Sequence, residues 1–262
     1  MKKFSQKLYF GLIMAFLYAP LIYLIAYSFN DGKTSVWKGF TLKWYVALFN
    51  DSQIMQSLYN TLLVAFLAAL FATVLGTMAA IGIHNFRGGF RTVVQNVSNV
   101  PIISPEIVTG VSLMLLFTFV GRLFGFEMGF WTVLLAHIGF CTPYVILNVS
   151  PRLRRMDNAI YEAALDLGCS PVKAFFKVVL PEIMPGIFSG MLISFTYSLD
   201  DFVITYFTRG NKFQTLPIQI YTMTHQRINP KANALSALLF VTILMILILI
   251  NIKGNKESKK AH

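Results

Sequence analysis

Two adjacent carboxylic acids, Asp200 and Asp201, lie inside an otherwise apolar stretch of the chain. An ionised side chain costs roughly 3 kcal/mol to place at the centre of a bilayer, so such a group faces a protein interior or a water-filled path. Facing a path, a carboxylate can bind a cation; otherwise it caps a helix or pairs with a neighbouring helix. Both interpretations are open for each acid. Adjacent residues on one helix point about 100° apart, so we do not expect both acids to face the same path.

A third acid, Glu106, follows Pro105 in another apolar stretch. Pro101 and Pro105 both disrupt helical hydrogen bonding, which predicts a bent or broken helix at this point. Glu106 then lies either at a cavity or over the free backbone N–H groups of a helix start, as a cap. The sequence leaves these two alternatives open.

The elements that carry these acids are predicted to be membrane-spanning helices. The chain has 262 residues, of which 56% are hydrophobic and only 13% are charged, and a soluble domain of this length could not bury so much apolar surface. We therefore predict an all-α integral membrane protein with six transmembrane helices. The predicted spans are approximately residues 8–29, 58–83, 97–120, 130–149, 186–207 and 232–252. Pro143 is expected to interrupt the fourth span.

The distribution of basic residues predicts the orientation and the domain organisation. Lys2, Lys3 and Lys7 precede the first span, which is too long for a signal peptide and lacks a clear cleavage site. Lys and Arg are also frequent in the loops predicted to be cytoplasmic, so we expect a multi-pass membrane protein with both termini in the cytoplasm. The basic residues between spans five and six oppose this orientation, but short flanks and the first helix usually decide it. The predicted parts are residues 1–54, an N-terminal span with an outer loop, residues 55–252, the transmembrane domain, and residues 253–262, a cytoplasmic tail.

Residues 151–185, the most polar long stretch between hydrophobic blocks, predict a compact helical hairpin. Asp157 can cap the first helix, and Gly168 can end it in a left-handed turn. Ser170 can cap a second helix, which we expect to end just before Pro181. From composition alone, an amphipathic loop at the membrane interface is the favoured interpretation of this stretch.

The hairpin sequence resembles the cytoplasmic EAA loop of permeases from binding-protein-dependent ABC importers, the MetI-like family. The matching pattern is Glu162-Ala163-Ala164, three residues, Gly168, nine residues, and then Val178-x-Leu180-Pro181, with Val178 where the family usually has Ile. In that family the loop forms the coupling helix, which sits in a groove on the ATPase subunit. The resemblance therefore implies ATPase coupling for Glu162, Ala163, Ala164, Asp166, Gly168, Leu180 and Pro181.

Within this family, residues 152–207 look most like the second permease of spermidine/putrescine importers. The resemblance rests on the stretch from Phe195 to Val203 and on the similar later stretches 216–221 and 229–235, and it implies polyamine transport. The candidate substrate-pathway residues are Asp200, Asp201, Glu106 and Tyr197. Two carboxylates independently suit a polycationic substrate, although the net charge of +11 does not. Related permeases for ferric ion, phosphonate or other small solutes share much of the pattern and remain alternatives.

The chain contains no motif for its own catalysis or ATP binding. It has no G-x-x-x-x-G-K-[ST] phosphate loop, no HExxH or GxSxG motif, and no clustered His or Cys site for a metal. His84, His137 and His225 are isolated and are expected to be structural or solvated, and Cys141 and Cys169 are expected to be packing residues. The basic residues form no face interleaved with aromatics, which argues against nucleic acid as a partner.

We therefore expect a transport subunit and not a membrane enzyme or scaffold. The resemblance implies four kinds of partner: a homologous second permease, two ATP-binding subunits that bind ATP and Mg, an extracytoplasmic substrate-binding protein, and the lipid membrane. No cofactor is expected in this chain. An ion-coupled secondary transporter is the less favoured alternative, because such proteins usually contain internal repeats and the EAA pattern would be unexplained.

Overall fold

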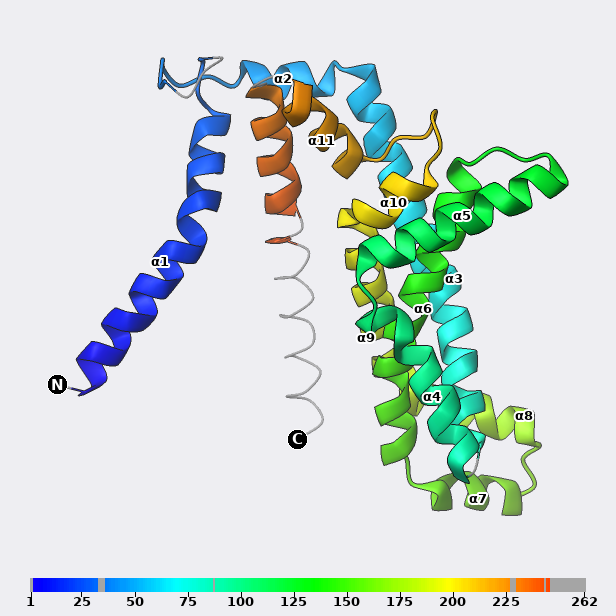
Figure 1. Cartoon of the computed structure of the whole chain (residues 1–262). Helices are drawn as coiled ribbons and strands as arrows, with labels where there is room; N and C mark the ends of the chain where they lie inside the picture. The colour runs from blue at the N-terminus through cyan, green and yellow to red at the C-terminus, as the bar shows by residue number, and fades with distance from the viewer. Residues whose placement is uncertain (1, 33–35, 87, 227–229, 243, 246–262) are drawn as a thin grey trace. The chain divides into compact units, whose positions relative to one another are not determined.

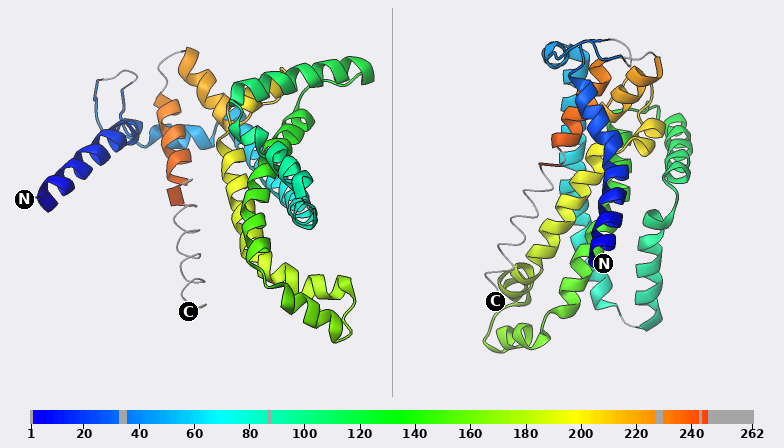
Figure 2. Two further views of the ribbon diagram at one scale, coloured as in Figure 1. Left: turned by 60° about the horizontal axis from the view of Figure 1, so that its bottom comes forward. Right: turned by 90° about the vertical axis from the view of Figure 1, so that its left-hand side faces the viewer.

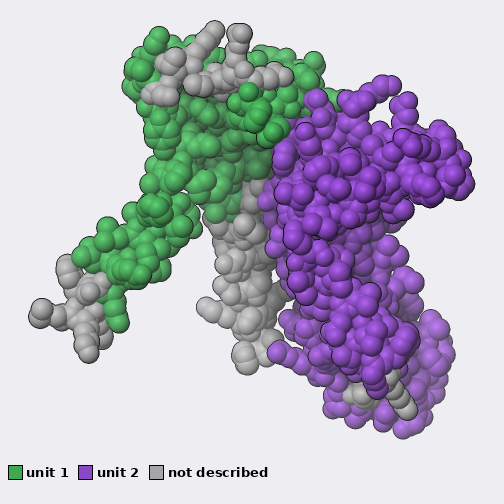
Figure 3. Space-filling model, in the orientation of Figure 1, with its two compact units in different colours: residues 1–57, 219–262 green, residues 58–218 purple. Residues whose placement is uncertain are grey.

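The computed structural model of the chain describes residues 2–32, 36–86, 88–226, 230–242 and 244–245. The chain forms two compact units (Figure 3), one made of residues 1–57 and 219–262 and the other of residues 58–218. Helices dominate both units, and the described residues contain one isolated β-bridge, between Asn30 and Phe40. The predicted all-α fold class is confirmed.

The helices are labelled in Figure 1. The first unit contains α1 (Lys2–Ser28), α2 (Lys43–Phe49) and the helical residues 230–242. The second unit contains most of α3 (Ser52–Asn85), then α4 (Gly88–Ile103), α5 (Glu106–Phe124), α6 (Phe130–Arg155), α7 (Asn158–Asp166), α8 (Pro171–Ala174), the π-helical turn η1 (Phe175–Val179), α9 (Leu180–Asp200) and α10 (Val203–Thr208). Helix α11 (Leu216–Gln226) begins in the second unit and continues into the first.

Five described helical segments are long and apolar enough to cross a membrane. They are Gln6–Ser28, Ser52–Asn85, Glu106–Phe124, Phe130–Arg155 and Pro171–Asp200. These correspond to the first five predicted spans, with shifted bounds. The sixth predicted span, residues 232–252, lies partly outside the described residues, and its beginning belongs to the helical segment 230–242.

Proline has different effects in two of these spans. The expected break in the third span is present, because α4 ends at Ile103 and α5 begins at Glu106, directly after Pro105. The expected interruption of the fourth span is wrong, because α6 continues through Pro143. Pro143 is buried against neighbouring helices. The missing N–H leaves the carbonyl of Gly139 without its usual donor, and close packing against neighbouring helices makes such a proline tolerable in a membrane helix.

The core of the second unit is formed where α3, α6 and α9 approach one another closely. Helices α6 and α9 lie side by side in Figures 1 and 2, and their buried residues form one apolar cluster with those of α3. Val145 of α6 is the central contact: a Cβ built on Gly76 would lie 2.6 Å from its Cβ, and one on Gly190 would lie 3.0 Å from its Cα. Small residues permit such close packing of membrane helices, so Val145 fills the space that two glycines leave.

We expect Gly76→Ala to destabilise the protein, because the new methyl group would overlap Val145 and the carbonyl of Thr142. Overpacking of this kind costs about 1–3 kcal/mol. The measurement is the melting temperature of the purified protein in detergent. Gly82→Ala is the matched control, since it lies in the same helix and no atom would lie within 4 Å of its Cβ. Equal melting temperatures for the two variants would contradict the assigned contact.

Candidate functional site

The two adjacent acids do not lie on one continuous helix. Helix α9 ends at Asp200, and Asp201 is extended, with φ −61° and ψ 124°, before α10 begins at Val203. The expectation that both acids share one helix, about 100° apart, is therefore wrong. The chain leaves the helix here because the Asp201 carboxylate caps the next one: it accepts from the backbone N–H of Ile204 at 3.3 Å and of Thr205 at 2.8 Å.

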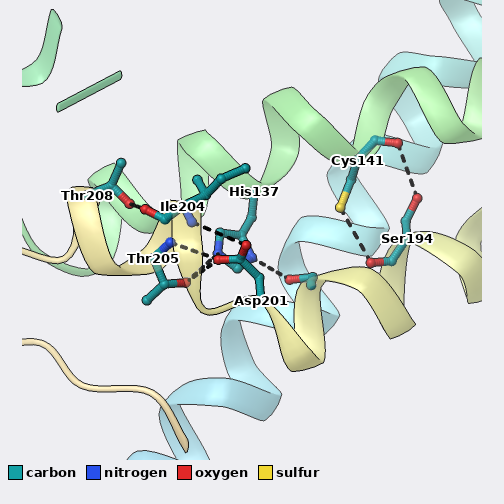
Figure 4. A network of polar contacts seen from close by, with 8 residues as sticks. His137, Cys141, Ser194, Asp201, Ile204, Thr205 and Thr208 are labelled. Atoms are coloured by element: carbon teal, nitrogen blue, oxygen red, sulfur yellow. Dashed lines mark hydrogen bonds and ion pairs between the residues drawn. The ribbon is translucent and has the colours of Figure 1, made fainter. Parts of the chain in front are cut away.

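A buried network holds the Asp201 carboxylate in place (Figure 4). Its side chain is only 6% exposed, and its Oδ2 accepts from the Thr205 hydroxyl at 2.8 Å. The imidazole of His137 on α6 lies beside it, with Nε2 at 3.4 Å from the same oxygen and 2.9 Å from Thr205 Oγ1. The other ring nitrogen, Nδ1, lies 2.6 Å from Ser198 Oγ on α9. Asp201 is thus a helix cap with buried polar partners.

Asp200 lies on the other side of the break, in a pocket. The pocket has a volume of about 300 Å³ and is lined by residues of α4, α5, α6, α9 and α10 and of the loops between them. The lining residues are Pro101, Ile102, Ser104, Glu106, Thr109, Phe140, Tyr144, Tyr197, Asp200, Asp201, Phe202, Val203 and Ile204. The structure therefore brings together all four residues that the sequence proposed for a substrate path, Asp200, Asp201, Glu106 and Tyr197. Their function remains a prediction.

The electrostatics of this pocket are acidic. No Lys or Arg is among its lining residues, and neither Asp200 nor Glu106 forms an ion pair with any residue that the structure describes. Glu106 is the first residue of α5, next to the broken third span. The lining also contains an aromatic pair: the rings of Tyr144 and Tyr197 stack with centroids 4.5 Å apart and an interplanar angle of 22°. Carboxylates beside stacked rings form a suitable environment for organic cations.

Sequence reasoning missed two residues of this site. His137 was interpreted as an isolated histidine, yet it contacts residues 61 and 68 positions away in the sequence. Tyr144 was not singled out, although it forms the stack with Tyr197. Neither residue belongs to a local motif, since both contacts depend on how α6 packs against α9. Long-range packing of this kind leaves no signal in a single sequence.

The hairpin begins as the sequence predicted. The Asp157 carboxylate accepts from the N–H of Ala159 at 2.9 Å, and the Ser170 hydroxyl accepts from the N–H of Lys173 at 3.4 Å. Gly168 has φ +83°, a left-handed conformation that residues with a side chain rarely adopt. The capping residues and the turn are confirmed.

The second arm of the hairpin differs from the prediction. It does not end before Pro181, because α8, η1 and α9 form one helical segment from Pro171 to Asp200. The π-helical turn explains this continuity: the N–H of Leu180 bonds to the carbonyl of Phe175, five residues back, directly before the proline. A π-turn rearranges the backbone bonds where Pro181 has no N–H to donate. The hairpin arm and Asp200 are therefore opposite ends of one helical segment.

The hairpin also exposes apolar side chains next to acidic ones. Glu162 and Asp166 of α7 are exposed, as are Ala163 and Gly168, whereas Ala164 and Leu180 are half-buried. Large apolar side chains of the hairpin are exposed as well. The exposed fractions are 57% for Ile160, 87% for Leu167, 66% for Val172 and 59% for Phe176. A contiguous exposed apolar patch with a polar rim is typical of an interaction surface.

Comparison with known proteins gives a consistent family. A profile of the family described as "Binding-protein-dependent transport system inner membrane component" matches residues 72–254. The chain is 36% identical to the spermidine/putrescine transport system permease protein PotC of Haemophilus influenzae, over 97% of this chain and 98% of that protein. It is 42% identical to the putrescine transport system permease protein PotI of Escherichia coli K12, over 86% of this chain and 81% of that protein.

Solved structures show the same fold. A bacterial ABC transporter involved in the import of the acidic polysaccharide alginate matches with a TM-score of 0.70 and 18% identity, over 97% of this chain and 95% of that chain. The methionine ABC transporter MetNI, in an inward-facing conformation, matches with a TM-score of 0.62 and 18% identity, over 81% of this chain and 99% of that chain. At this identity the likeness concerns the fold alone.

Apolar helices packed around an acidic pocket, with an exposed hairpin joined to one of them, define a membrane transport component of the MetI-like fold. The chain belongs to the family of binding-protein-dependent transport system inner membrane components. It is a multi-pass inner-membrane permease, and its partners are of the ABC-transporter type. The family and the importer-permease class predicted from the EAA pattern are confirmed.

The separation of the two acids predicts that replacing Asp201 lowers stability and that replacing Asp200 does not. Asp201→Ala removes the cap of α10 and leaves buried donors without an acceptor, which costs about 1–3 kcal/mol. We expect a lower melting temperature of the purified protein. Asp200→Ala is the control in the adjacent residue and should melt like the wild type, since its carboxylate forms no ion pair in the described part of the chain. A larger loss for Asp200→Ala would contradict the assigned roles.

Proposed function

We propose that this chain forms the translocation path for a polyamine, spermidine or putrescine, as one permease subunit of an ABC importer. The observation that carries the proposal is the pocket, in which Asp200 and Glu106 lie without a basic partner in the described residues, beside the stacked rings of Tyr144 and Tyr197. The relatives described above, a spermidine/putrescine and a putrescine permease, support the same substrate class.

The chemistry of the pocket matches that of an aliphatic polycation. A charge pair about 4 Å apart is worth about 1 kcal/mol in water and about 4 kcal/mol near a protein surface, so one carboxylate can hold one ammonium group without trapping it. An ammonium group over an aromatic face gains about 0.5–2 kcal/mol more. Apolar lining residues such as Phe140, Phe202 and Ile102 suit the methylene segments between the amines.

The pocket also discriminates among the alternative solutes. A phosphonate is an anion, and an acidic pocket without Lys or Arg in its lining would repel it. A ferric ion requires several converging ligands, and the described residues contain no group of three or more His, Cys, Asp or Glu side chains that could hold a metal. The high net charge of the chain does not oppose the proposal, because charges beyond about 10 Å are screened and the local acids decide.

The proposed complex also contains a homologous second permease, two ATP-binding subunits that bind ATP and Mg, and a substrate-binding protein outside. The exposed apolar and acidic hairpin is proposed to dock on the ATP-binding subunit through Glu162, Ala163, Ala164, Asp166, Gly168, Leu180 and Pro181. This proposal places the hairpin and both termini in the cytoplasm. ATP-driven movement at the hairpin would reach Asp200 through the helical segment Pro171–Asp200.

Replacing Asp200 with Asn tests the substrate path. The change keeps the size of the side chain and removes its charge, so we expect polyamine uptake to fall about tenfold, since about 1.4 kcal/mol corresponds to a factor of ten. The measurement is uptake of labelled putrescine and spermidine by the complete complex in cells without other polyamine uptake.

The matched control for this experiment is Asp31→Asn, which removes one negative charge from a residue that does not line the pocket. Protein level and co-purification of the partner subunits are measured for both variants. Wild-type uptake in Asp200→Asn, at equal protein level, would refute a pathway role for this residue.

The hairpin turn offers a separate test of coupling. Gly168→Val places a β-branched residue at φ +83°, which strongly disfavours the turn. Gly168→Asn is the milder change, because asparagine adopts this left-handed conformation more readily than other residues with a side chain. We expect the Val variant to lose substrate-stimulated ATP hydrolysis and uptake, and the Asn variant to retain most of both. Because no atom of this chain would lie within 4 Å of a Cβ at this position, a loss that is confined to the Val variant reports on the backbone of the turn. Equal activity of the two variants would exclude the turn as a coupling element.

A further inference from the structure

One imidazole connects both sides of the break between α9 and α10. His137 extends from α6, is only 1% exposed, and lies within hydrogen-bonding distance of Ser198 on α9 and Thr205 on α10. The break itself contains Asp201, which lies 3.4 Å from the same ring. The His137 side chain thus connects α6 with α9 and α10, which meet at this break (Figure 4). We call the break between α9 and α10 the α9–α10 joint.

The positions of the protons in this network follow from its acceptors. Thr205 Oγ1 lies 2.8 Å from Asp201 Oδ2 and must donate its proton there, because the carboxylate can only accept. Thr205 Oγ1 then accepts from His137, so Nε2 carries a hydrogen. The other ring nitrogen, Nδ1, forms the second contact of the imidazole, with the Ser198 hydroxyl. The side chains of Ser198, His137, Thr205 and Asp201 therefore form one connected network, and fully satisfied networks of this kind fix a single geometry.

The two pocket acids, Asp200 and Glu106, lie on helices that meet or pack against this joint. Asp200 is the last residue of α9, immediately before the break, and its direction depends on how α9 ends. Helix α10 packs against α5, whose first residue is Glu106. A Cβ on Gly110 of α5 would lie 2.8 Å from the ring of Phe207, which shows how closely these two helices approach. The His137 ring also lies against Phe140, a lining residue, with centroids 5.1 Å apart.

We propose that His137 is a positioning residue for the substrate pocket: it locks the α9–α10 joint to α6 and thereby directs the Asp200 carboxylate into the pocket. His137 itself does not line the pocket. The relevance of this role for polyamine uptake rests on the function proposed above, whereas the positioning can be measured without any substrate.

His137→Phe tests the proposal most directly, because it keeps a ring of similar size and removes both bridging contacts. It leaves the three bonds by which Asp201 caps α10 intact. His137→Gln is the rescue variant, since its amide carries a donor and an acceptor at a spacing close to that of the two ring nitrogens. Ser194→Ala is the matched control: it removes an equally buried contact between α9 and α6, from Ser194 Oγ to the carbonyl of Cys141, away from the joint.

The direction of residue 200 is read from the reactivity of a thiol introduced by Asp200→Cys. The assembled complex carries Cys169→Ser as well, and the remaining Cys141 is fully buried. The probe is the small cationic reagent 2-aminoethyl methanethiosulfonate. We expect His137→Phe to change the modification rate about fivefold or more, His137→Gln to restore it partly, and Ser194→Ala to leave it unchanged, because the reactivity of a thiol depends on its exposure and electrostatic surroundings.

Uptake by the complex that retains Asp200 gives the second readout. We expect His137→Phe to raise the polyamine concentration for half-maximal uptake about tenfold with a similar maximal rate, as for loss of about 1.4 kcal/mol of binding. Should His137→Phe fail to assemble, Ser198→Ala cuts only the α9 side of the bridge and is measured in the same thiol assay, with an expected change of the same direction.

A thiol reactivity that is unchanged in His137→Phe, or changed equally in Ser194→Ala, would overturn the positioning role. Where His137→Phe does not assemble, an unchanged rate in Ser198→Ala would overturn it equally. Absence of polyamine uptake by the wild-type complex would instead refute the proposed substrate and leave the thiol result decisive for His137.

Discussion

The pocket depends on one constraint, the interruption of the helix at Asp201. A continuous helix would place both acids on the same apolar segment and leave two charges to be satisfied by neighbouring helices. Instead the Asp201 carboxylate accepts hydrogen bonds from the free N–H groups at the start of α10 and from the Thr205 hydroxyl. One charge thus becomes part of the scaffold, and the other, on Asp200, remains available beside the cavity. Irregular backbone at membrane depth is tolerated only where it is buried in protein or lines a cavity, and this joint meets both conditions.

A second constraint acts at the opposite end of the same segment. Pro181 and Pro185 would be expected to weaken the helix near the hairpin, yet the segment from Pro171 to Asp200 is continuous. The π-helical turn at Phe175–Val179 rearranges the backbone bonds before Pro181, and the buried Val179 and Ile183 hold this region against α6 and α3. Thirty residues of helix correspond to roughly 45 Å. A rigid segment of that length can transmit a displacement that a flexible linker would absorb.

The sequence was informative where the physics is local. Capping residues such as Asp157 and Ser170 and the left-handed Gly168 could be predicted because each acts within one or two turns of its own position. Apolar segments of sufficient length identified the spans for the same reason. The EAA pattern identified the family, because it is a fixed spacing within a single hairpin. The break beside Asp200 was missed, since a run of apolar residues on both sides gives no local sign of it.

The contacts that form the site could not be predicted, because they join distant segments. His137 has no neighbouring acid or hydroxyl in the sequence that distinguishes it from a core histidine, and its partners come from α9 and α10. The continuity of α6 through Pro143 likewise depends on tertiary packing, which offsets a local tendency to kink. Local propensity therefore gave the wrong result at Pro143 and Pro181, and α4 also continues through Pro101. It gave the right result at Pro105, where the following residue begins a new helix.

The positions of the two available acids bear on how a transport path can release what it binds. Asp200 and Glu106 are at ends of different helices, α9 and α5, and not on one rigid element. A cation held between them is bound more tightly when the two helix ends are close, and more weakly when they separate, because the Coulomb energy falls with distance. Weak binding by each acid alone then becomes an advantage, since neither can retain the cation once the pair has opened. Under the proposed function, the helical segment that moves is also the one that ends in Asp200. Substrate affinity and conformation therefore change together.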